Sequence, residues 1–287
     1  MSFIQDIKKL FREKENGLMQ LIVINCVIFL VVNILNVFIN GFSDNVDSYF
    51  AVTSNFRTLL YHPWSLVTYM FLHESISHIL FNMLWLYWMG QLFVQYLGSK
   101  RLIGTFFLGG ISGAVLYILA YNLIPGMPQN TLTIGASGGI MAVIVAVATL
   151  VPNQEINLMF FGPVRLKYVA LAAFILTSII DFSINTGGKI THIGGALFGY
   201  FYILQYKKGK DISLRFFTFF ERMRPTFQKK PRMKVAYKRP ISDEEYNVRK
   251  TDNQRKTDVI LDKISRAGYD SLTKEEKEFL FHISNKR

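Results

Sequence analysis

The feature that most constrains this chain is a series of apolar runs bounded by polar or basic residues. The first extends from Leu18 to Ile39, and about 20 apolar residues suffice to cross a bilayer as a helix. Similar runs cover 77–97, 100–122, 137–151, a stretch that ends near Asp181, and 192–206. Only helices or closed barrels satisfy their backbone groups in lipid. The sequence therefore predicts an all-α, polytopic membrane protein with six transmembrane helices.

Basic residues follow every second run. They lie in a leader at 1–17, at Lys100 and Arg101, at Arg165 and Lys167, and in the tail from Lys207 onward. Cytoplasmic loops carry an excess of Lys and Arg, so we expect both termini in the cytoplasm. A multi-pass protein of a bacterial plasma membrane is the simplest expectation, since no transit-type leader precedes the first run. Orientation and anionic lipid explain the net charge of +12, and we expect no nucleic-acid partner.

The distribution of charge predicts three parts. Residues 1–17 form the leader, 18–206 the membrane domain and 207–287 a basic tail. Within the tail, 211–223 is typical of an amphipathic helix on a membrane surface. A linker is expected at 225–240. Two short helices, broken at Gly268, are expected at 257–287, and a capping box, Thr273-x-x-Glu276, opens the second.

Three polar residues are candidates for catalysis. Ser137 lies in the sequence GASGG, where an uncharged loop turns into the fourth run. His78 falls in the first turns of the second run, and His192 at the start of the sixth. These three runs all begin on the side opposite the basic loops, so the three side chains are expected at similar depth. Ionisable residues inside a membrane are costly and usually functional.

The residue types suit acyl transfer. A serine hydroxyl is a weak nucleophile that needs a nearby base, and His192 can take its proton. The tetrahedral intermediate carries an oxyanion that needs aimed donors. His78 and Asn82 are four residues apart, so they share one helix face, and we count them with Gly135 as assisting residues. Small residues at 138, 142 and 146, and at 195 and 199, would let the fourth and sixth helices approach closely.

These motifs resemble those of the rhomboid intramembrane proteases over roughly residues 15–206. The match comprises H-x-x-x-N at 78–82, G-x-S-G at 135–138, and His192 followed by small residues. The resemblance implies a six-helix rhomboid-like bundle. It also implies a Ser137–His192 dyad without a third carboxylate, and cleavage of transmembrane substrates near their extracytoplasmic end. No metal or cofactor is implied. Two positions depart from the family pattern: Ser65, where many members have Arg, and Met141, where many have an aromatic residue.

Several alternatives remain open. Asp181 could orient His192 as a triad acid, although a helix end at the interface explains it better. The chain could be a catalytically silent rhomboid-like protein that binds transmembrane helices, but such proteins lack the serine or the histidine. A transporter would show internal repeats, and none is seen. His73 is expected at the membrane interface, in contact with a loop or with lipid headgroups. Cys26 can form no intramolecular disulfide. The sequence leaves the substrate, the oligomeric state and the role of the tail open.

Overall fold

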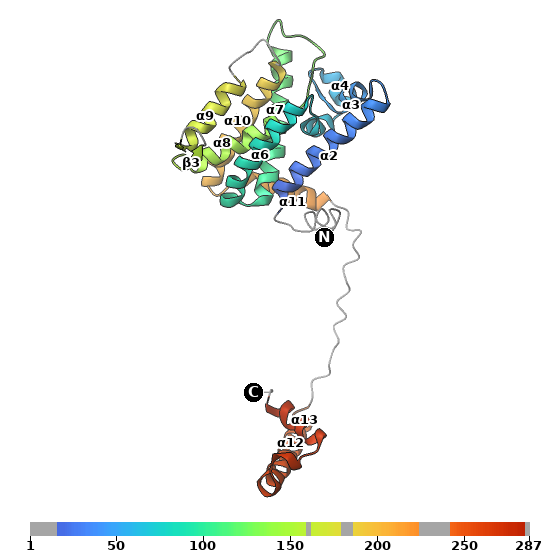
Figure 1. The fold of residues 1–287 in the computed structure, drawn as a ribbon, viewed down its shortest axis with the longest axis vertical. Coiled ribbons are helices and arrows are strands. Elements are labelled where there is room, and N and C mark those ends of the chain that lie inside the picture. Colours follow the sequence, from blue (N-terminus) through green and yellow to red (C-terminus); the bar gives the residue numbers. More distant parts are fainter. Residues whose placement is uncertain (1–15, 159–161, 179–185, 224–241, 285–287) are drawn as a thin grey trace. The chain divides into compact units, whose positions relative to one another are not determined.

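The computed structural model describes residues 16–158, 162–178, 186–223 and 242–284, and these are mostly helical (Figure 1). The chain divides into two compact units, 1–225 and 226–287, and each is described by itself. Nearly all of the expected leader, Asp181, and the expected linker at 225–240 lie outside the described residues.

Six helices of the first unit correspond to the expected apolar runs. They are α2 (Gly17–Phe38), α6 (Ile76–Leu97), α7 (Ser99–Leu123), α8 (Ser137–Leu150), α9 (Leu166–Ser178) and α10 (Thr186–Lys207). By length and composition, α2 and α7 could each cross a membrane, while α8 and α9 are apolar but shorter. The first four of the six begin and end within two residues of the expected positions, because their apolar runs are sharply bounded.

Two small antiparallel sheets depart from the all-helical prediction. Strand β1 (Val52–Thr53) pairs with β2 (Leu132–Thr133), and β3 (Glu155–Leu158) forms a hairpin with β4 (Gly162–Arg165). Two-residue strands leave no readable period in the sequence, and β1 and β2 are far apart in the chain. The long connection before α6 also contains short helices. These are α3 (Phe42–Phe50), α4 (Phe56–Tyr61), α5 (Ser65–Thr68) and the 3₁₀ turn η1 (Tyr69–Phe71).

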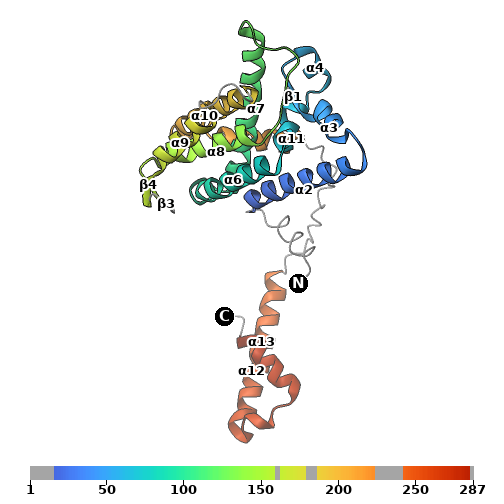
Figure 2. The same ribbon diagram turned by 45° about the horizontal axis from the view of Figure 1, so that its top comes forward.

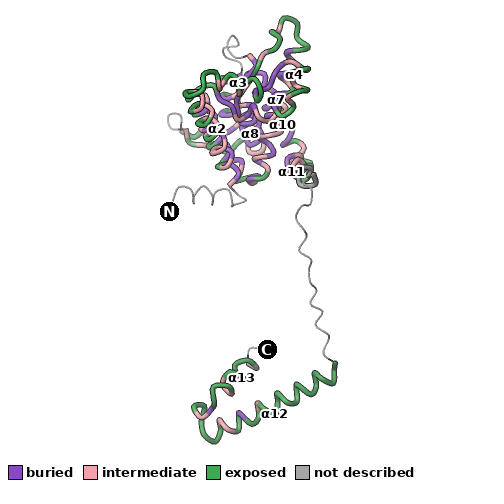
Figure 3. The backbone as a smooth tube through the Cα atoms, turned by 90° about the vertical axis from the view of Figure 1, so that its right-hand side faces the viewer, coloured by how far each residue is buried: buried purple, intermediate pink, exposed green. Residues whose placement is uncertain are grey.

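The centre of the first unit is formed by α7, α8 and α10, which pack along one another (Figures 1 and 2). Glycines allow this approach. A Cβ atom at Gly195 would collide with the carbonyl oxygen of Gly138, and one at Gly199 with that of Ala142. This confirms the expected close packing of the fourth and sixth helices. Helix α8 is buried over most of its length, whereas α2 keeps an exposed outer face (Figure 3).

Helix α10 begins earlier than the sequence suggested. A loop was expected at 183–191, but the helix starts at Thr186 and places His192 almost two turns inside it. In the fold Gly187 lets the helix pass close to α7, since a Cβ atom there would lie 3.0 Å from the Tyr117 ring. Tertiary packing thus overrides the low helix propensity of glycine.

The basic segments gather at one end of the first unit. The amide of Gly17 donates to Ser99 Oγ at 2.8 Å, which joins the start of α2 to the start of α7. Tyr96 Oη donates to Gln154 Oε1 at 3.2 Å, which joins the end of α6 to the connection after α8. Lys207, the last residue of α10, donates from Nζ to the carbonyl of Thr149 at 3.0 Å. We call this the basic end.

Helix α11 (Ile212–Met223) is tied to the basic end through Asp211. Arg101 Nε lies 2.6 Å from Asp211 Oδ2, while Asp211 Oδ1 accepts hydrogen bonds from Ser213 Oγ at 3.0 Å and from the Leu214 amide at 3.1 Å. Partial burial raises the pKa of Asp211, but the bonds from Arg101, Leu214 and Ser213 outweigh it, so this pKa lies below its ordinary value. Asp211 is therefore both the N-cap of α11 and its attachment to α7.

Replacing Asp211 with alanine is expected to release α11, whereas Asp211→Asn keeps a capping oxygen and removes only the charge. We expect the alanine variant to lose about 1 kcal/mol of local stability and the asparagine variant less. Because the folded-state pKa is lowered, the carboxylate's contribution is fully present above its unfolded pKa and is lost as pH falls below about 4. Limited proteolysis within residues 212–223 measures the release. Equal protection in both variants and wild type would contradict the assignment.

The second unit is a helical hairpin of α12 (Asp243–Ala267) and α13 (Lys274–Ser284), with the 3₁₀ turn η2 (Tyr269–Ser271) between them. The helix expected from 257 begins at 243 instead, because Ser242 caps it and three acidic residues occupy its first turn. The break at Gly268 and the capping box are confirmed. The Thr273 amide donates to Glu276 Oε2 at 2.7 Å, and the Glu276 amide donates to Thr273 Oγ1 at 3.3 Å.

Candidate active site

Ser137 is the first residue of α8, at the end of the unit opposite the basic end. The preceding turn depends on Gly135, whose φ of +128° lies in the region that favours glycine. Its amide donates to the Tyr69 carbonyl at 2.9 Å, which fixes the turn to η1. The first amides of a helix have no intrahelical acceptor, so the backbone around Ser137 offers donors to a developing negative charge.

The loop that carries Ser137 is held by the connection before α6. Besides the β1–β2 pairing, the Thr131 amide donates to Ser54 Oγ at 3.0 Å, and Asn122 Nδ2 donates to the Ser54 carbonyl at 2.7 Å. Asn55 Nδ2 donates to Asn130 Oδ1 at 2.5 Å. These bonds tie the connection before α6 to the loop that leads to Ser137 and to the last turn of α7. Ser65, which stands where many rhomboids have Arg, takes part in none of them.

A small cavity of about 50 Å³ brings the main candidates together. Its lining includes Ser137 from α8, His192 from α10, Asn82 from α6 and Thr177 from α9. Ser137 and His192 are half-buried, whereas Asn82 is buried. Four helices that are separated in the sequence therefore present polar groups to one small cavity.

His192 is oriented by a backbone group. Its Nδ1 lies 3.1 Å from the carbonyl oxygen of Thr177, in the last described turn of α9. A carbonyl only accepts, so this contact requires the proton on Nδ1 and leaves Nε2 as an acceptor. That is the tautomer that a general base needs.

His78 lies beside the serine turn. A Cβ atom added at Gly135 would be 3.0 Å from His78 Nε2 and 3.6 Å from Ser137 Oγ, so the imidazole and the hydroxyl both lie next to this glycine. His73 is buried in the protein, and its ring centroid is 5.1 Å from that of His78.

Sequence reasoning missed three contributors to the site. Thr177 acts through its backbone carbonyl, which no side-chain pattern could reveal. Tyr69 anchors the serine turn through its own carbonyl, while its hydroxyl donates to the Gly110 carbonyl at 2.7 Å. Trp85 lines the cavity three residues after Asn82 on α6. It lies on the same helix face as His78 and Asn82, and this spacing could have identified it from the sequence. Met141 also lines the cavity.

No cluster of three potential metal ligands from His, Cys, Asp or Glu occurs among the residues that the structure describes.

Comparison with protein families gives two matches. A model of the Rhomboid domain matches residues 61–208, which is just over half of the chain and contains the cavity described above. A second model, of a family of unknown function (DUF6576), matches residues 242–286 and thus the helical hairpin.

Curated relatives agree with the first match. RHOMBOID-like protein 12, mitochondrial, of Arabidopsis thaliana is 27% identical over 191 residues, 61% of this chain and 54% of that protein. Presenilin-associated rhomboid-like protein, mitochondrial, of Mus musculus is 33% identical over 143 residues, 46% and 35% of the two chains. Rhomboid-like protease 3 of Toxoplasma gondii is 27% identical over 161 residues, 56% of each. The chain thus spans about half or less of these relatives.

These names correct the expected location. A bacterial plasma membrane was expected, but several relatives are mitochondrial proteins by name, so the comparisons contradict that location. The Rhomboid match, the order of the motifs and the relatives agree on one conclusion: the chain belongs to the rhomboid family.

Proposed function

We propose that this chain is an intramembrane serine endopeptidase that cleaves transmembrane substrates near the end of the bundle that carries Ser137. The observation that carries the proposal is the cavity shared by Ser137, His192 and Asn82, with the His192 ring held by Thr177. Rhomboid-like protease 3 is a protease by name, and the same activity is inferred here from the site.

We further infer that α2, α6, α7, α8, α9 and α10 are the six spans. Helices of 22 residues, such as α6 and α10, are about 33 Å long, enough for a hydrocarbon core. Helix α8 is shorter, but protein surrounds it, so its ends need not reach the lipid headgroups. Large apolar side chains are exposed on α2, α6, α9 and α10, among them Leu30, Phe81, Leu176 and Phe201, and lipid would cover them.

The proposed reaction uses each group at a defined step. Ser137 Oγ attacks the scissile carbonyl carbon while His192 Nε2 takes the hydroxyl proton. The resulting oxyanion is stabilised by His78, by Asn82 and by the amides beside Gly135 and Ser137. His192 then passes its proton to the leaving amine. Water next attacks the acyl-enzyme with His192 again as base, which releases the second product and restores Ser137.

The cavity also indicates how substrate enters. A volume of about 50 Å³ holds one or two water molecules, not a peptide. Its walls include Asn82 and Trp85 of α6 and Ala173 and Thr177 of α9, so movement of these two helices apart would enlarge it. Parting α6 and α9 would move the carbonyl that orients His192, which couples substrate entry to the geometry of the base.

The test is cleavage of a single-span model substrate by the full chain in proteoliposomes. We expect one principal cut, near the end of the substrate helix that lies level with Ser137, because the site is recessed at that end of the bundle. Mass spectrometry of the products maps the bond. Binding of several substrates without any cleavage would contradict the proposal and favour a silent, helix-binding rhomboid. Cleavage at the basic end would contradict the proposed site.

A further inference from the structure

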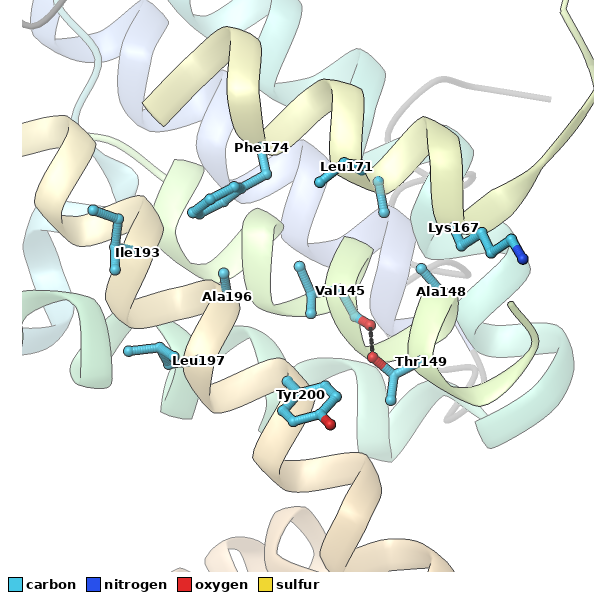
Figure 4. Close-up of a pocket in the computed structure, with 11 residues that line it drawn as sticks. Val145, Ala148, Thr149, Lys167, Leu171, Phe174, Ile193, Ala196, Leu197 and Tyr200 are labelled. Carbon is cyan, nitrogen blue, oxygen red and sulfur yellow. Dashed lines mark hydrogen bonds between the residues drawn. The ribbon is translucent and has the colours of Figure 1, made fainter. Parts of the chain in front are cut away.

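A second, larger cavity lies in a different part of the bundle. It is a groove of about 370 Å³ between α8, α9 and α10, drawn in Figure 4. Most of its lining is apolar, from Val145, Ala148, Leu171, Phe174, Ile193 and Leu197. Lys167 and Thr149 lie together at one part of the groove, with the Lys167 ammonium at its edge, whereas Phe174 and Ile193 lie at the far part (Figure 4).

The groove follows from unequal helix packing. Helices α8 and α10 approach closely because Gly195 and Gly199 face the backbone of α8. Helix α9 packs much less extensively against either of them. Small side chains at Ala148, Ala170 and Ala196 line the space between the three helices and leave it unfilled.

One ammonium group lies at the edge of this groove, and a second is bonded to one of its lining residues. Lys167 lines the groove directly, and its Nζ lies 5.1 Å from the centroid of the Tyr168 ring. Lys207 is not a lining residue, but its Nζ donates to the carbonyl of Thr149, which is one, at 3.0 Å. Among the described carboxylates, none forms an ion pair with either lysine. An apolar groove with these cations beside it is complementary to an anion with a hydrocarbon chain.

The chemistry of the groove suits a lipid. Its largely apolar lining matches an extended hydrocarbon chain, and the Lys167 ammonium at its edge matches an anionic headgroup. Basic pockets between transmembrane helices commonly bind the headgroups of anionic lipids.

We propose that this groove is a binding site for one anionic phospholipid, with an acyl chain between α8, α9 and α10 and the phosphate at Lys167 and Lys207. The inference rests on the membrane-spanning arrangement given under the proposed function. It adds a defined lipid ligand, at a place separate from the cavity of Ser137.

The site has a consequence for α9. The chain end of the lipid would contact Phe174, one turn before Thr177, and Ile193, which follows His192. A bound acyl chain would fill the space that α9 leaves open and would support the helix whose carbonyl orients His192. The lipid therefore stabilises α9 in the position seen here.

The experiment measures lipid binding in a protein that cannot turn over. Ser137→Ala protein of full length is delipidated and exposed to phosphatidylglycerol or phosphatidylcholine, and bound lipid is counted by native mass spectrometry. We expect a preference for phosphatidylglycerol that falls about fivefold for each lysine removed in Lys167→Gln and Lys207→Gln. The matched control is the pair Lys100→Gln and Lys208→Gln, which removes the same charge from exposed positions outside the groove.

A second variant tests the apolar part. Ala196→Leu adds three carbon atoms to the groove and should lower the binding of both lipids while it leaves the headgroup preference unchanged. The proposal is overturned if the control pair reduces the preference as much as the groove pair, or if Ala196→Leu leaves binding unchanged. Displacement of the lipid by an excess of a single-span peptide would also overturn it. Cleavage by wild type is assayed separately, so loss of the proposed protease function would leave this result interpretable.

Discussion

Replacing Ser137 with alanine is expected to lower the rate of substrate cleavage by about 10⁴-fold or more, because the variant has no nucleophile for acyl transfer. His192→Ala should cost a similar factor, since the serine hydroxyl then has no base. The double variant should be hardly worse than either single one, because residues that act as one unit are strongly non-additive. Initial rates with a single-span substrate in proteoliposomes measure all three.

A matched control is Ser112→Ala. Ser112 Oγ donates to the Gly194 carbonyl at 3.1 Å, so this serine also links to α10, but it does not line the cavity. We expect it to keep most of the activity. If Ser137→Ala still cuts, the assignment of the nucleophile is wrong. If the losses in the single variants multiply in the double variant, Ser137 and His192 do not work as a dyad.

The second large effect is expected for Gly195→Ala, which adds a single methyl group to α10 and should lower the stability of the protein. Alanine favours a helix over glycine by about 1 kcal/mol, so propensity alone predicts that Gly195→Ala stabilises α10. The structure predicts the opposite, because the added Cβ would collide with the backbone of Gly138, which cannot rotate away as a side chain can. We expect a loss of about 2–3 kcal/mol, at the upper end for overpacking.

Activity should fall as well, since Gly195 is one turn from His192 and Gly138 follows Ser137, so forcing α8 and α10 apart separates the two groups. Thermal unfolding in detergent, followed by cleavage assays, measures both effects. Ala172→Val is the control, because this alanine is exposed on α9, lines neither the cavity nor the groove and should tolerate extra volume. A Gly195→Ala protein more stable than wild type would show that α8 and α10 are not packed as described.

The fold could be predicted from the sequence where the signal is local. The apolar runs of α2, α6, α7 and α8 end at charges, glycines or prolines, so their bounds follow from composition. The same reasoning failed at α10, where a loop was expected at 183–191 but the helix begins at Thr186 and Gly187 packs against Tyr117 of α7. It also failed at β1 and β2, whose residues pair only because the first connection folds back onto the serine loop.

The side chains of the candidate site could be predicted from the sequence, but the backbone groups that hold them in place could not. Ser137, His192, His78 and Asn82 could be proposed from residue type and depth alone. The structure places Ser137, His192 and Asn82 at one cavity, with His78 beside the serine turn at Gly135. It also buries His73 in the protein, beside His78.

The sequence by itself determined that this chain forms apolar helices and which side chains could perform acyl transfer, because hydrophobicity and chemical type belong to individual residues. Only the tertiary structure decided that the Thr177 carbonyl orients His192, that Tyr69 holds the Gly135 turn, and that α9 stands away from α8 and α10 to leave a groove. Those features depend on backbone atoms and on distances between segments far apart in the chain. Neither the backbone contacts nor these distances can be read from the order of the side chains in the sequence.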